Sequence, residues 1–570
     1  MRRARPQPAT RPALALSVLW ALLPLLALSP AAVAQPLPSA GGQLQQIPPS
    51  PAVPPPAQDI RLVEQPAVSL SPADSGLRVH VRTLRIRGAQ VYSEQDLLAL
   101  TGFRPDSELT LADLQAMAAR ITAHYRQHGY FVAQAYLPAQ EVQDQTLTIA
   151  VTEGRYGHIT LNNQAGIADW QVRTLTADLQ PGQVIAARPL ERALLLLSDL
   201  PGVSTSSTLV PGAAAGSSDL LLDLAPGARL NGSIDADNAG NRYTGAYRLG
   251  ATVNLNNPMG WGDVASLRVL NSGSGLRYAR ASYQVPFGAT QVGVAYSRLD
   301  YALGREFDSL GASGRAEVVS LYGRHALLRS RSDNLYVQLA LDARRFHDAV
   351  DASAFVLDKR TRVATISLYG DRRDEVMAGA VSAFSLAGSL GDVQIRTPAV
   401  REFDAVTGQS AGRFSKLVVS AMRLQRIAGP FSLYGAVRGQ LASKNLDVSE
   451  KMELGGINGV RAYPEGEAFA DQGYLVTLEA RLDLPAPSHH LAGQWQAMVF
   501  ADTGGATADK NPWLGTSRQR RLSGAGAGLE WTRPGDFTVR TFYAAKLGSA
   551  KATSAPDRSG RLWVQLVKYF

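Results

Sequence analysis

The chain contains no cysteine, which excludes disulfide bonds and thiolate metal sites. Charged residues make up only 18% of its 570 residues, a small share for a soluble enzyme. Beyond the N-terminal region there is no uninterrupted run of 18 apolar residues, so no transmembrane helix is expected. The mean hydropathy is nevertheless close to neutral, at −0.08. A transmembrane β-barrel combines these properties, because its strands alternate apolar and polar residues.

The net charge of +9 raises the question of nucleic-acid binding. No dense run of Lys and Arg occurs beyond the N-terminus, so nucleic acid is not expected as a partner. The cations are mostly arginines spread singly through strand-like segments. We interpret them as water-facing residues of a pore or as charges at its rim.

No residue pattern indicates an enzyme, and we expect neither a metal site nor a cofactor. Gly408-Gln409-Ser410-Ala411-Gly412 fits a nucleophile elbow, but polar residues precede it and a strand-like segment follows, so we expect an extracellular loop. His124 and His128 lie four residues apart on a predicted helix, and no glutamate follows His124. That spacing favours a solvated helix face over a zinc site.

The N-terminus has the pattern of a secretory signal peptide over residues 1–34. Arginines in the first 11 residues precede an apolar run, Leu14–Leu28, and the small residues Ala32-Val33-Ala34. We predict cleavage after Ala34. The alternative, a membrane anchor helix, is disfavoured because the run is short and prolines interrupt it.

Residues 35–76 are rich in proline and predict an extended, semi-rigid linker. Only a short stretch, Gln43 to Ile47, precedes most of these prolines. A long helix that fills a pore is therefore not expected here.

Two small α/β modules are predicted next, over residues 77–154 and 155–227. Each shows a strand, two helices and two strands, an order whose recurrence suggests a repeated module. In the first, Ser93 and Thr110 begin the helices and Gly129 ends the second helix. The expected strands are Val79–Ile86, Tyr130–Tyr136 and Gln145–Val151 in the first module, and Gly157–Leu161, Val203–Leu209 and Asp219–Leu224 in the second.

Residues 228–570 alternate apolar and polar residues in segments of about ten, the length of a tilted strand that crosses a bilayer. About sixteen strands with their loops fit this length. A soluble β-sandwich would also alternate, but its buried faces need bulky residues, and here many apolar positions are Ala, Gly or Thr. The last residue, Phe570, resembles the C-terminal recognition signal of bacterial outer-membrane barrels, although Lys568 falls on the expected apolar face. The predicted fold is α+β periplasmic modules followed by an antiparallel transmembrane β-barrel.

This combination resembles the transporters of two-partner secretion, in the outer-membrane assembly factor superfamily, over nearly all of the chain after the signal peptide. The two modules look like polypeptide-transport-associated (POTRA) domains. In the first module the likeness is carried by Thr110–Leu114, Tyr125, Gly129-Tyr130 and Ala135–Pro138.

The sharpest likeness is Gly459-Val460-Arg461-Ala462-Tyr463, followed by Pro464-Glu465-Gly466-Glu467. It is similar to the tip of the family's long inward-folding loop, Val-Arg-Gly-aromatic, with Ala462 where glycine is usual. A second motif, Phe-x-Asp-x-Gly on a later barrel strand, is matched by Phe500, Asp502 and Gly504. The resemblance implies that Arg461 pairs with Asp502 inside the barrel, as a guanidinium can with a carboxylate. Without this resemblance, Arg461 would be interpreted as an ordinary loop residue and Asp502 as an ordinary lumen residue.

The resemblance implies a pore in the outer membrane of a Gram-negative bacterium that translocates a partner protein, such as an adhesin or a haemolysin. The POTRA domains would bind that protein in the periplasm by pairing one of its strands with an exposed edge of their sheets. Other implied partners are outer-membrane lipid and, during biogenesis, the barrel-assembly machinery. The main alternative is a factor that inserts other proteins into the membrane; such relatives usually have more POTRA domains. A passive porin or receptor fits the modules less well.

Overall fold

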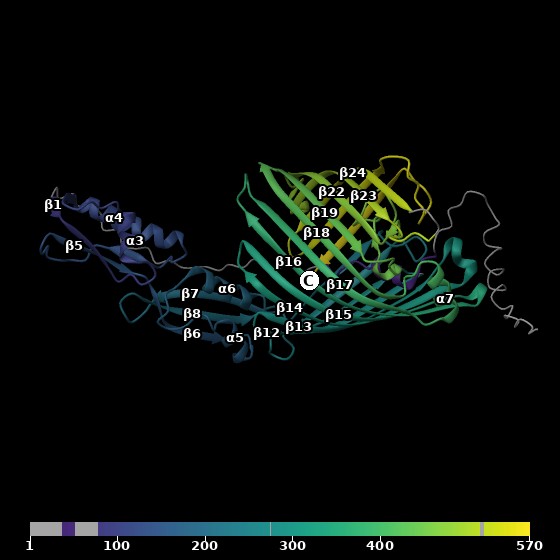
Figure 1. Cartoon of the computed structure of the whole chain (residues 1–570), viewed down its shortest axis with the longest axis horizontal. Coiled ribbons are helices and arrows are strands. Elements are labelled where there is room, and N and C mark those ends of the chain that lie inside the picture. Colours follow the sequence, from purple (N-terminus) through teal and green to yellow (C-terminus); the bar gives the residue numbers. More distant parts are fainter. Residues whose placement is uncertain (1–36, 52–77, 274, 514–517) are drawn as a thin grey trace, which may run out of the picture.

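The computed structural model describes residues 37–51, 78–273, 275–513 and 518–570. Two α/β modules lie in a row and lead to one end of a large barrel (Figure 1). The predicted signal peptide and much of the Pro-rich segment lie outside the described residues. None of the described helices is long and apolar enough to cross a membrane.

The first module is a three-stranded sheet covered by two helices. Its strand order is β2-β5-β4, with β2 parallel and β4 antiparallel to β5. Helix α4 begins after Thr110, whose hydroxyl accepts a hydrogen bond from the Asp113 amide while the Asp113 carboxylate accepts one from the Thr110 amide. The helix buries residues at three- and four-residue spacing, among them Ile121 and Tyr125. The elements are β1 (Arg78–Val81), β2 (Thr83–Arg87), α3 (Glu94–Thr101), β3 (Ser107–Thr110), α4 (Leu111–Gln127), β4 (Gln134–Tyr136) and β5 (Thr146–Thr152).

The expected single strand before the first helix is wrong in detail. The predicted strand is interrupted at Arg82. As a result, β1 pairs with β3 in a separate two-stranded sheet, while β2 pairs with β5. Strand β3 was not predicted, because its four residues are too few to show alternation.

The second module has the strand order β6-β8-β7, with β6 parallel and β7 antiparallel to β8. This is the arrangement of the first module, in which the first and last strands are also parallel neighbours. Its elements are β6 (Arg155–Asn163), α5 (Asp169–Leu175), α6 (Ala187–Ser198), β7 (Val203–Pro211) and β8 (Ser217–Pro226).

The two modules are joined by backbone hydrogen bonds and a shared core. The Ala187 amide donates to the Gly129 carbonyl at 2.8 Å, and the Ile185 amide donates to the Gly154 carbonyl at 2.9 Å. Val132 of the first module packs into the core of the second. Close by, the Tyr125 hydroxyl donates to the buried Glu153 carboxylate at 2.9 Å, and burial raises the pKa of this tyrosine.

The second module is fixed to the barrel through three periplasmic turns. The fully buried Gln171 donates to the carbonyls of Trp261 and Pro286 and accepts from the Gly288 amide. Asp199 forms two bonds of 2.8 Å with the guanidinium of Arg329. This module therefore has a defined orientation on the barrel entrance.

The barrel is closed by sixteen antiparallel strands, which confirms the predicted fold class. Tyr247 and Leu249 face outward and are 77% and 60% exposed, whereas Arg248 between them faces the lumen. The strands are β9 (Leu230–Asp237), β10 (Arg248–Asn256), β11 (Val264–Asn271), β12 (Leu276–Phe287), β13 (Thr290–Ala302), β14 (Ala312–Arg329), β15 (Asp333–Val350), β16 (Phe355–Asp374), β17 (Ala380–Ile395), β18 (Gly412–Ala428), β19 (Phe431–Ala442), β22 (Gln472–Leu484), β23 (Gln494–Thr507), β24 (Gln519–Arg533), β25 (Phe537–Lys546) and β26 (Gly560–Tyr569).

The first and last strands close the barrel over a short seam. Strands β26 and β9 pair from Gln565↔Asp237 to Tyr569↔Ser233. Phe570 extends the seam, because its amide and carbonyl both bond to the Gly232 backbone. Lys568 is a charged residue at a position where the sequence predicts an apolar face. It is half-exposed and pairs with Asp536 in the adjacent periplasmic turn.

Helix α7 (Pro398–Val406) lies in the extracellular loop between β17 and β18. Gly408–Gly412 follows it, and the Ser410 hydroxyl donates to the Asp404 carboxylate at 2.7 Å. The remaining short elements are η2 (Arg305–Leu310), η3 (Asp351–Ser353), η4 (Val448–Glu450), β20 (Met452–Glu453), β21 (Phe469–Ala470) and η5 (His489–Leu491).

Candidate functional site

The loop between β19 and β22, residues 443–471, folds back into the lumen. Its tip is the motif Val460-Arg461-Ala462-Tyr463, in which the three uncharged residues are completely buried and Arg461 is 5% exposed. The Val460 amide donates to the Leu454 carbonyl at 2.7 Å and makes the tip a tight turn. The sequence folds in this way because the tip carries apolar side chains that pack on the barrel wall.

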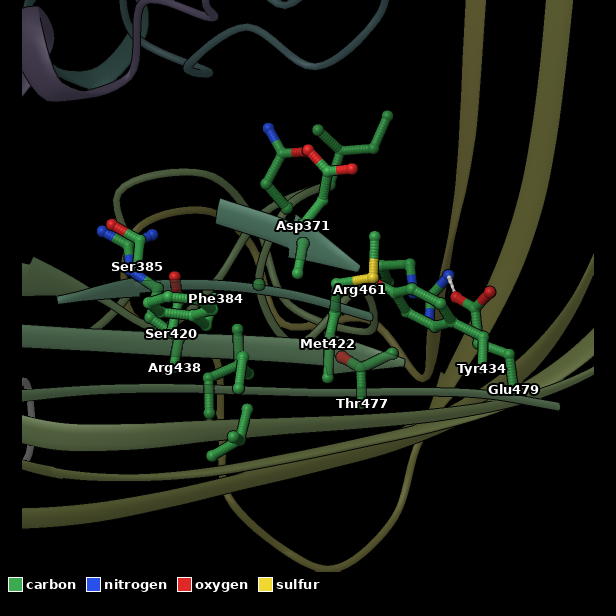
Figure 2. A pocket seen from close by; sticks show the side chains of 18 of the residues that line it. Asp371, Phe384, Ser385, Ser420, Met422, Tyr434, Arg438, Arg461, Thr477 and Glu479 are labelled. Atoms are coloured by element: carbon green, nitrogen blue, oxygen red, sulfur yellow. Dashed lines mark ion pairs between the residues drawn. The ribbon is translucent and has the colours of Figure 1, made fainter. Parts of the chain in front are cut away.

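Arg461 is held by two carboxylates on neighbouring strands. Its Nε and one terminal nitrogen each donate to Asp502 on β23 at 2.8 Å, and the other terminal nitrogen pairs with Glu479 on β22 at 2.8 Å (Figure 2 shows the pair with Glu479). The Thr477 hydroxyl also donates to Asp502, at 3.0 Å. Each of the three guanidinium nitrogens thus contacts a carboxylate on the wall, an arrangement that a lysine cannot reproduce.

Aromatic side chains enclose the same arginine. The guanidinium carbon lies 3.4 Å from the centroid of the Phe500 ring and 5.4 Å from that of Phe542 on β25. The Trp563 indole on β26 donates to the Arg461 carbonyl at 2.7 Å. Arg461 therefore links the loop tip to strands on both sides of β24.

Three glycines on the lumen face of β24 make room for this packing. A Cβ on Gly524 would lie 2.5 Å from the Ala462 Cβ, and one on Gly526 would lie 2.6 Å from the Phe500 ring. The third, Gly528, faces the Phe542 ring. The methyl group of Ala462, which departs from the family's usual glycine, occupies the space that Gly524 leaves empty.

Gly504 of the second motif has a similar role on β23. A Cβ there would lie 3.0 Å from Leu454 of the loop. Tyr463 completes the tip, because its hydroxyl donates to the Ala550 carbonyl at 2.9 Å.

The two arms of the loop are anchored by further buried ion pairs. On the first arm, Asp447 pairs with Lys359 at 2.6 Å, and Glu450 pairs with Arg344 at 2.7 Å and Lys416 at 2.8 Å. On the second arm, the fully buried Glu467 pairs with Arg520.

Helix α2 (Ala40–Gln45) lies inside the barrel, on the side opposite the tip of the loop. The Ala40 amide donates to Asp348 of β15 at 2.7 Å, and Arg248 of β10 donates to the Gln46 carbonyl at 2.9 Å. The helix also touches the loop, since the Gln45 amide group donates to the Val448 carbonyl at 2.7 Å.

The expectation that residues 35–76 form only an extended linker is therefore wrong for α2. The residues from Ser39 to Ile47 contain no proline, and they supply a single compact turn of helix. Six residues are too few for a stable helix in water. The barrel wall stabilises this one by accepting its first free amide and covering its apolar face.

A cavity of about 830 Å³ lies on the periplasmic side of the loop tip. Its walls carry charges of both signs and several aromatic rings, and Arg461, Glu479 and Tyr434 lie together at one end (Figure 2). In the described part of the chain, no group of three or more acidic or histidine side chains has the geometry to hold a metal ion.

The structure brings together the residues singled out in the sequence, Val460 to Tyr463 with Phe500, Asp502 and Gly504, while Phe570 lies apart at the seam. Sequence reasoning missed Glu479, Trp563 and the glycines of β24. Glu479 carried a signal, because it falls on the polar face of a predicted strand. Its place beside Arg461 depends on strand register, which the sequence does not specify.

Fold and site together define an outer-membrane β-barrel with periplasmic POTRA domains. The chain belongs to the haemolysin secretion/activation protein family ShlB/FhaC/HecB, whose family model matches residues 216–531, more than half of the chain. The ShlB-type POTRA domain matches residues 79–154. Relatives of this kind are two-partner secretion transporters, which move partner proteins across the outer membrane.

Among curated relatives, the heme/hemopexin transporter protein HuxB of Haemophilus influenzae is 28% identical over 81% of this chain and 82% of its own length. The outer membrane transporter CdiB of Dickeya dadantii is 22% identical over 73% of this chain and 74% of its own. Among solved structures, CdiB from Escherichia coli has the same fold, with a TM-score of 0.69, 20% identity and coverage of 89% of this chain and 93% of its own. BamA from Haemophilus ducreyi lacking POTRA domains 1–3 aligns with a TM-score of 0.53 and 13% identity, over 86% of this chain and 100% of its own.

Proposed function

We propose that this protein is a gated pore that exports one specific partner protein, and that Arg461 holds the gate closed. The observation that carries the proposal is the pairing of the loop arginine with two carboxylates on the lumen wall. Removing one partner of a buried, hydrogen-bonded charge pair costs about 3–5 kcal/mol. Undocking the loop separates these buried charges, so the loop stays docked until another interaction replaces the pair.

Loop 443–471 and helix α2 fill different parts of the lumen, and both must move before an extended chain passes. The loop tip lies against β22–β26, whereas α2 lies against the first strands, with Asp348 and Arg248 among its partners. The contact between Gln45 and Val448 joins the two obstructions. We propose that α2 leaves the lumen and that the loop then rearranges.

The exported protein first meets the periplasmic modules. Residues 155–227 are proposed as a second POTRA domain, because their strand order matches that of the first. Within its sheet, the edge strand β7 pairs only with β8 and leaves one side open to an added strand. The fixed junction through Gln171 and Asp199 would hold this edge close to the barrel entrance.

The remaining assignments follow from the same reading. Residues 1–34 are proposed as a cleaved signal peptide that directs the chain to the periplasm. The protein is proposed to have no catalytic activity and to need no cofactor, so that folding of the cargo outside the cell drives its movement. Outer-membrane lipid and, during biogenesis, the barrel-assembly machinery are proposed as its further partners.

The test compares culture-medium proteins from cells that lack the gene and are complemented with wild type, Arg461→Ala or Arg540→Ala. Arg540 is a matched control, because this half-exposed arginine lines the same cavity and pairs with Glu530 at 3.0 Å rather than with the loop. We expect one large protein to disappear from the medium of the deletion strain and to return with wild type and Arg540→Ala. With Arg461→Ala it should fall at least tenfold, while heat-modifiable barrel remains in the outer membrane.

Two outcomes would contradict the proposal. Normal export from Arg461→Ala would remove the role of the arginine in the gate. An unchanged medium with fewer outer-membrane barrels in the deletion strain would instead identify a factor that inserts other proteins.

A further inference from the structure

The strands β14 to β16 are longer than a membrane requires. Strand β15 has 18 residues. At about 3.3 Å per residue and a tilt of about 40°, it spans roughly 45 Å along the barrel axis, whereas the apolar band is about 25 Å tall. The extracellular ends of these strands therefore stand at and above the level of the outer-leaflet head groups.

Cross-strand register places charged residues in rows on the outer surface of these ends. In one row Glu317 is opposite Arg345, and Arg345 is opposite Arg360. Arg362 lies two residues further along β16, between Ala343 of β15 and Asp392 of β17. The side chains face away from the lumen, since the intervening Phe346 and Thr361 are buried inside at 2% and 1% exposure.

In the parts of the chain that the structure covers, Arg345, Arg360 and Arg362 form no ion pair, although all are exposed. Of the nearby carboxylates, Asp300 pairs with Arg315 at 2.7 Å and Asp358 with His347 at 2.8 Å. Glu317 lies opposite Arg345 and Asp392 lies opposite Arg362, and these two carboxylates offset part of the arginines' charge. Like charges directly opposite on adjacent strands repel each other, so Arg345 and Arg360 destabilise the sheet unless an anion lies between them.

A hollow and an apolar surface adjoin the three arginines. The hollow has a volume of about 570 Å³, and its lining carries an excess of positive charge. Four arginines, Arg315, Arg345, Arg360 and Arg396, line it with two carboxylates, Glu317 and Asp358. Toward the membrane the outward rows become apolar. Their exposed members are Leu339, Leu341, Ile366 and Leu390.

We propose that Arg345, Arg360 and Arg362 bind the phosphorylated head group of an outer-leaflet glycolipid, whose acyl chains lie along the apolar rows beneath. Guanidinium groups match phosphate oxygens bidentately, and clusters of basic residues beside a membrane attract anionic head groups. A free phosphate would account for the arginines alone. The continuity between the arginines and the apolar rows favours an amphiphile. The site faces away from the lumen, so the proposal stands or falls independently of the export function.

The test uses the purified full-length protein, stripped of lipid in detergent and incubated with bis-phosphorylated lipid A or with its dephosphorylated form. Bound lipid is counted by native mass spectrometry. The variant Arg345→Gln/Arg360→Gln/Arg362→Gln is compared with Arg372→Gln/Arg373→Gln/Arg426→Gln, which removes the same charge from the periplasmic end. Heat-modifiable migration on a gel shows whether each barrel is folded.

We expect wild type and the periplasmic control to retain phosphorylated lipid A at least tenfold more strongly than the first variant does. Dephosphorylated lipid A should bind wild type only as weakly as the phosphorylated form binds that variant. Equal retention by wild type and the variant would overturn the proposal, as would equal binding of both lipids. Displacement of the lipid by millimolar inorganic phosphate would identify a free-phosphate site instead. If the variant does not fold, the comparison of the two lipids on wild type still decides.

Discussion

Arg461 shows how one side chain is held by residues far apart in the sequence. Asp502 lies 41 residues away and Trp563 lies 102 residues away, yet both bond to it at less than 3 Å. Charge, hydrogen bonding and ring stacking act on the same guanidinium. The site therefore depends on an assembled barrel, because the strands from β22 to β26 must first be paired in order.

The contact between Ala462 and Gly524 yields a prediction at this scale. Gly524→Ala should displace the loop tip and reduce export at least tenfold, because the new Cβ would lie 2.5 Å from the Ala462 Cβ. Ala462→Gly in the same chain should restore export to within about twofold, since it removes the clashing methyl group. Export is measured from the medium.

The control for this pair is Gly388→Ala on β17, where an added Cβ meets no atom within 4 Å. That variant should export normally. Failure of Ala462→Gly to rescue Gly524→Ala would show that the loop tip is not what Gly524 accommodates.

Only the resemblance to a family allowed Arg461 and Asp502 to be predicted as parts of one site. Composition and spacing give no reason to pair a loop residue with one particular lumen residue. Glu479 and Trp563 were missed for the same reason, because their positions beside Arg461 follow from strand register and barrel closure.

At the scale of elements, the barrel strands were the most predictable part. Their outward residues alternate over the full length of a bilayer-crossing strand, and this periodicity is set by lipid outside and water inside. Helix α2 was not predictable, because its stability comes from Asp348 and the loop rather than from its own residues. Strand β3 was missed because it is only four residues long.

The position of α2 beside the loop gives a prediction for this element. A Cβ on Gly42 would lie 3.6 Å from Val448 Cγ2, so Gly42→Cys with Val448→Cys is within reach of a disulfide. The natural chain has no cysteine to interfere. We expect export to stop when the disulfide is formed and to resume when it is reduced.

Each single cysteine variant serves as a control and should export under both conditions. Continued export by a fully cross-linked protein would mean that α2 and the loop need not separate. Cross-linking is measured by gel mobility with and without reductant in the same samples.

At the scale of the whole molecule, the junction between the second module and the barrel determines where captured chain is presented. Gln171 satisfies three backbone groups in two periplasmic turns. Leaving a buried polar group without a partner costs about 1–3 kcal/mol. Gln171→Ala should therefore loosen the module and lower export severalfold without preventing barrel folding.

Hydrogen exchange of the turn at residues 257–263 measures the loosening directly, and the medium measures export. Gln180→Ala is the matched control, because Gln180 is an exposed residue of the same module. Faster exchange with unchanged export would separate the rigidity of the junction from transport.

The loop and α2 also have a consequence for the cell that carries this pore. The Arg461 pair and the buried ion pairs on both arms hold the loop docked, so an undocked loop is a rare state. An undocked loop still leaves α2 in the lumen, and α2 is held by bonds of its own to β10 and β15. Antibiotics and bile salts leak through the unused pore only when the loop is undocked and α2 has left the lumen at the same time. The exported protein, in contrast, displaces both obstructions when it binds. In this way a wide channel can be present in the outer membrane without making that membrane permeable.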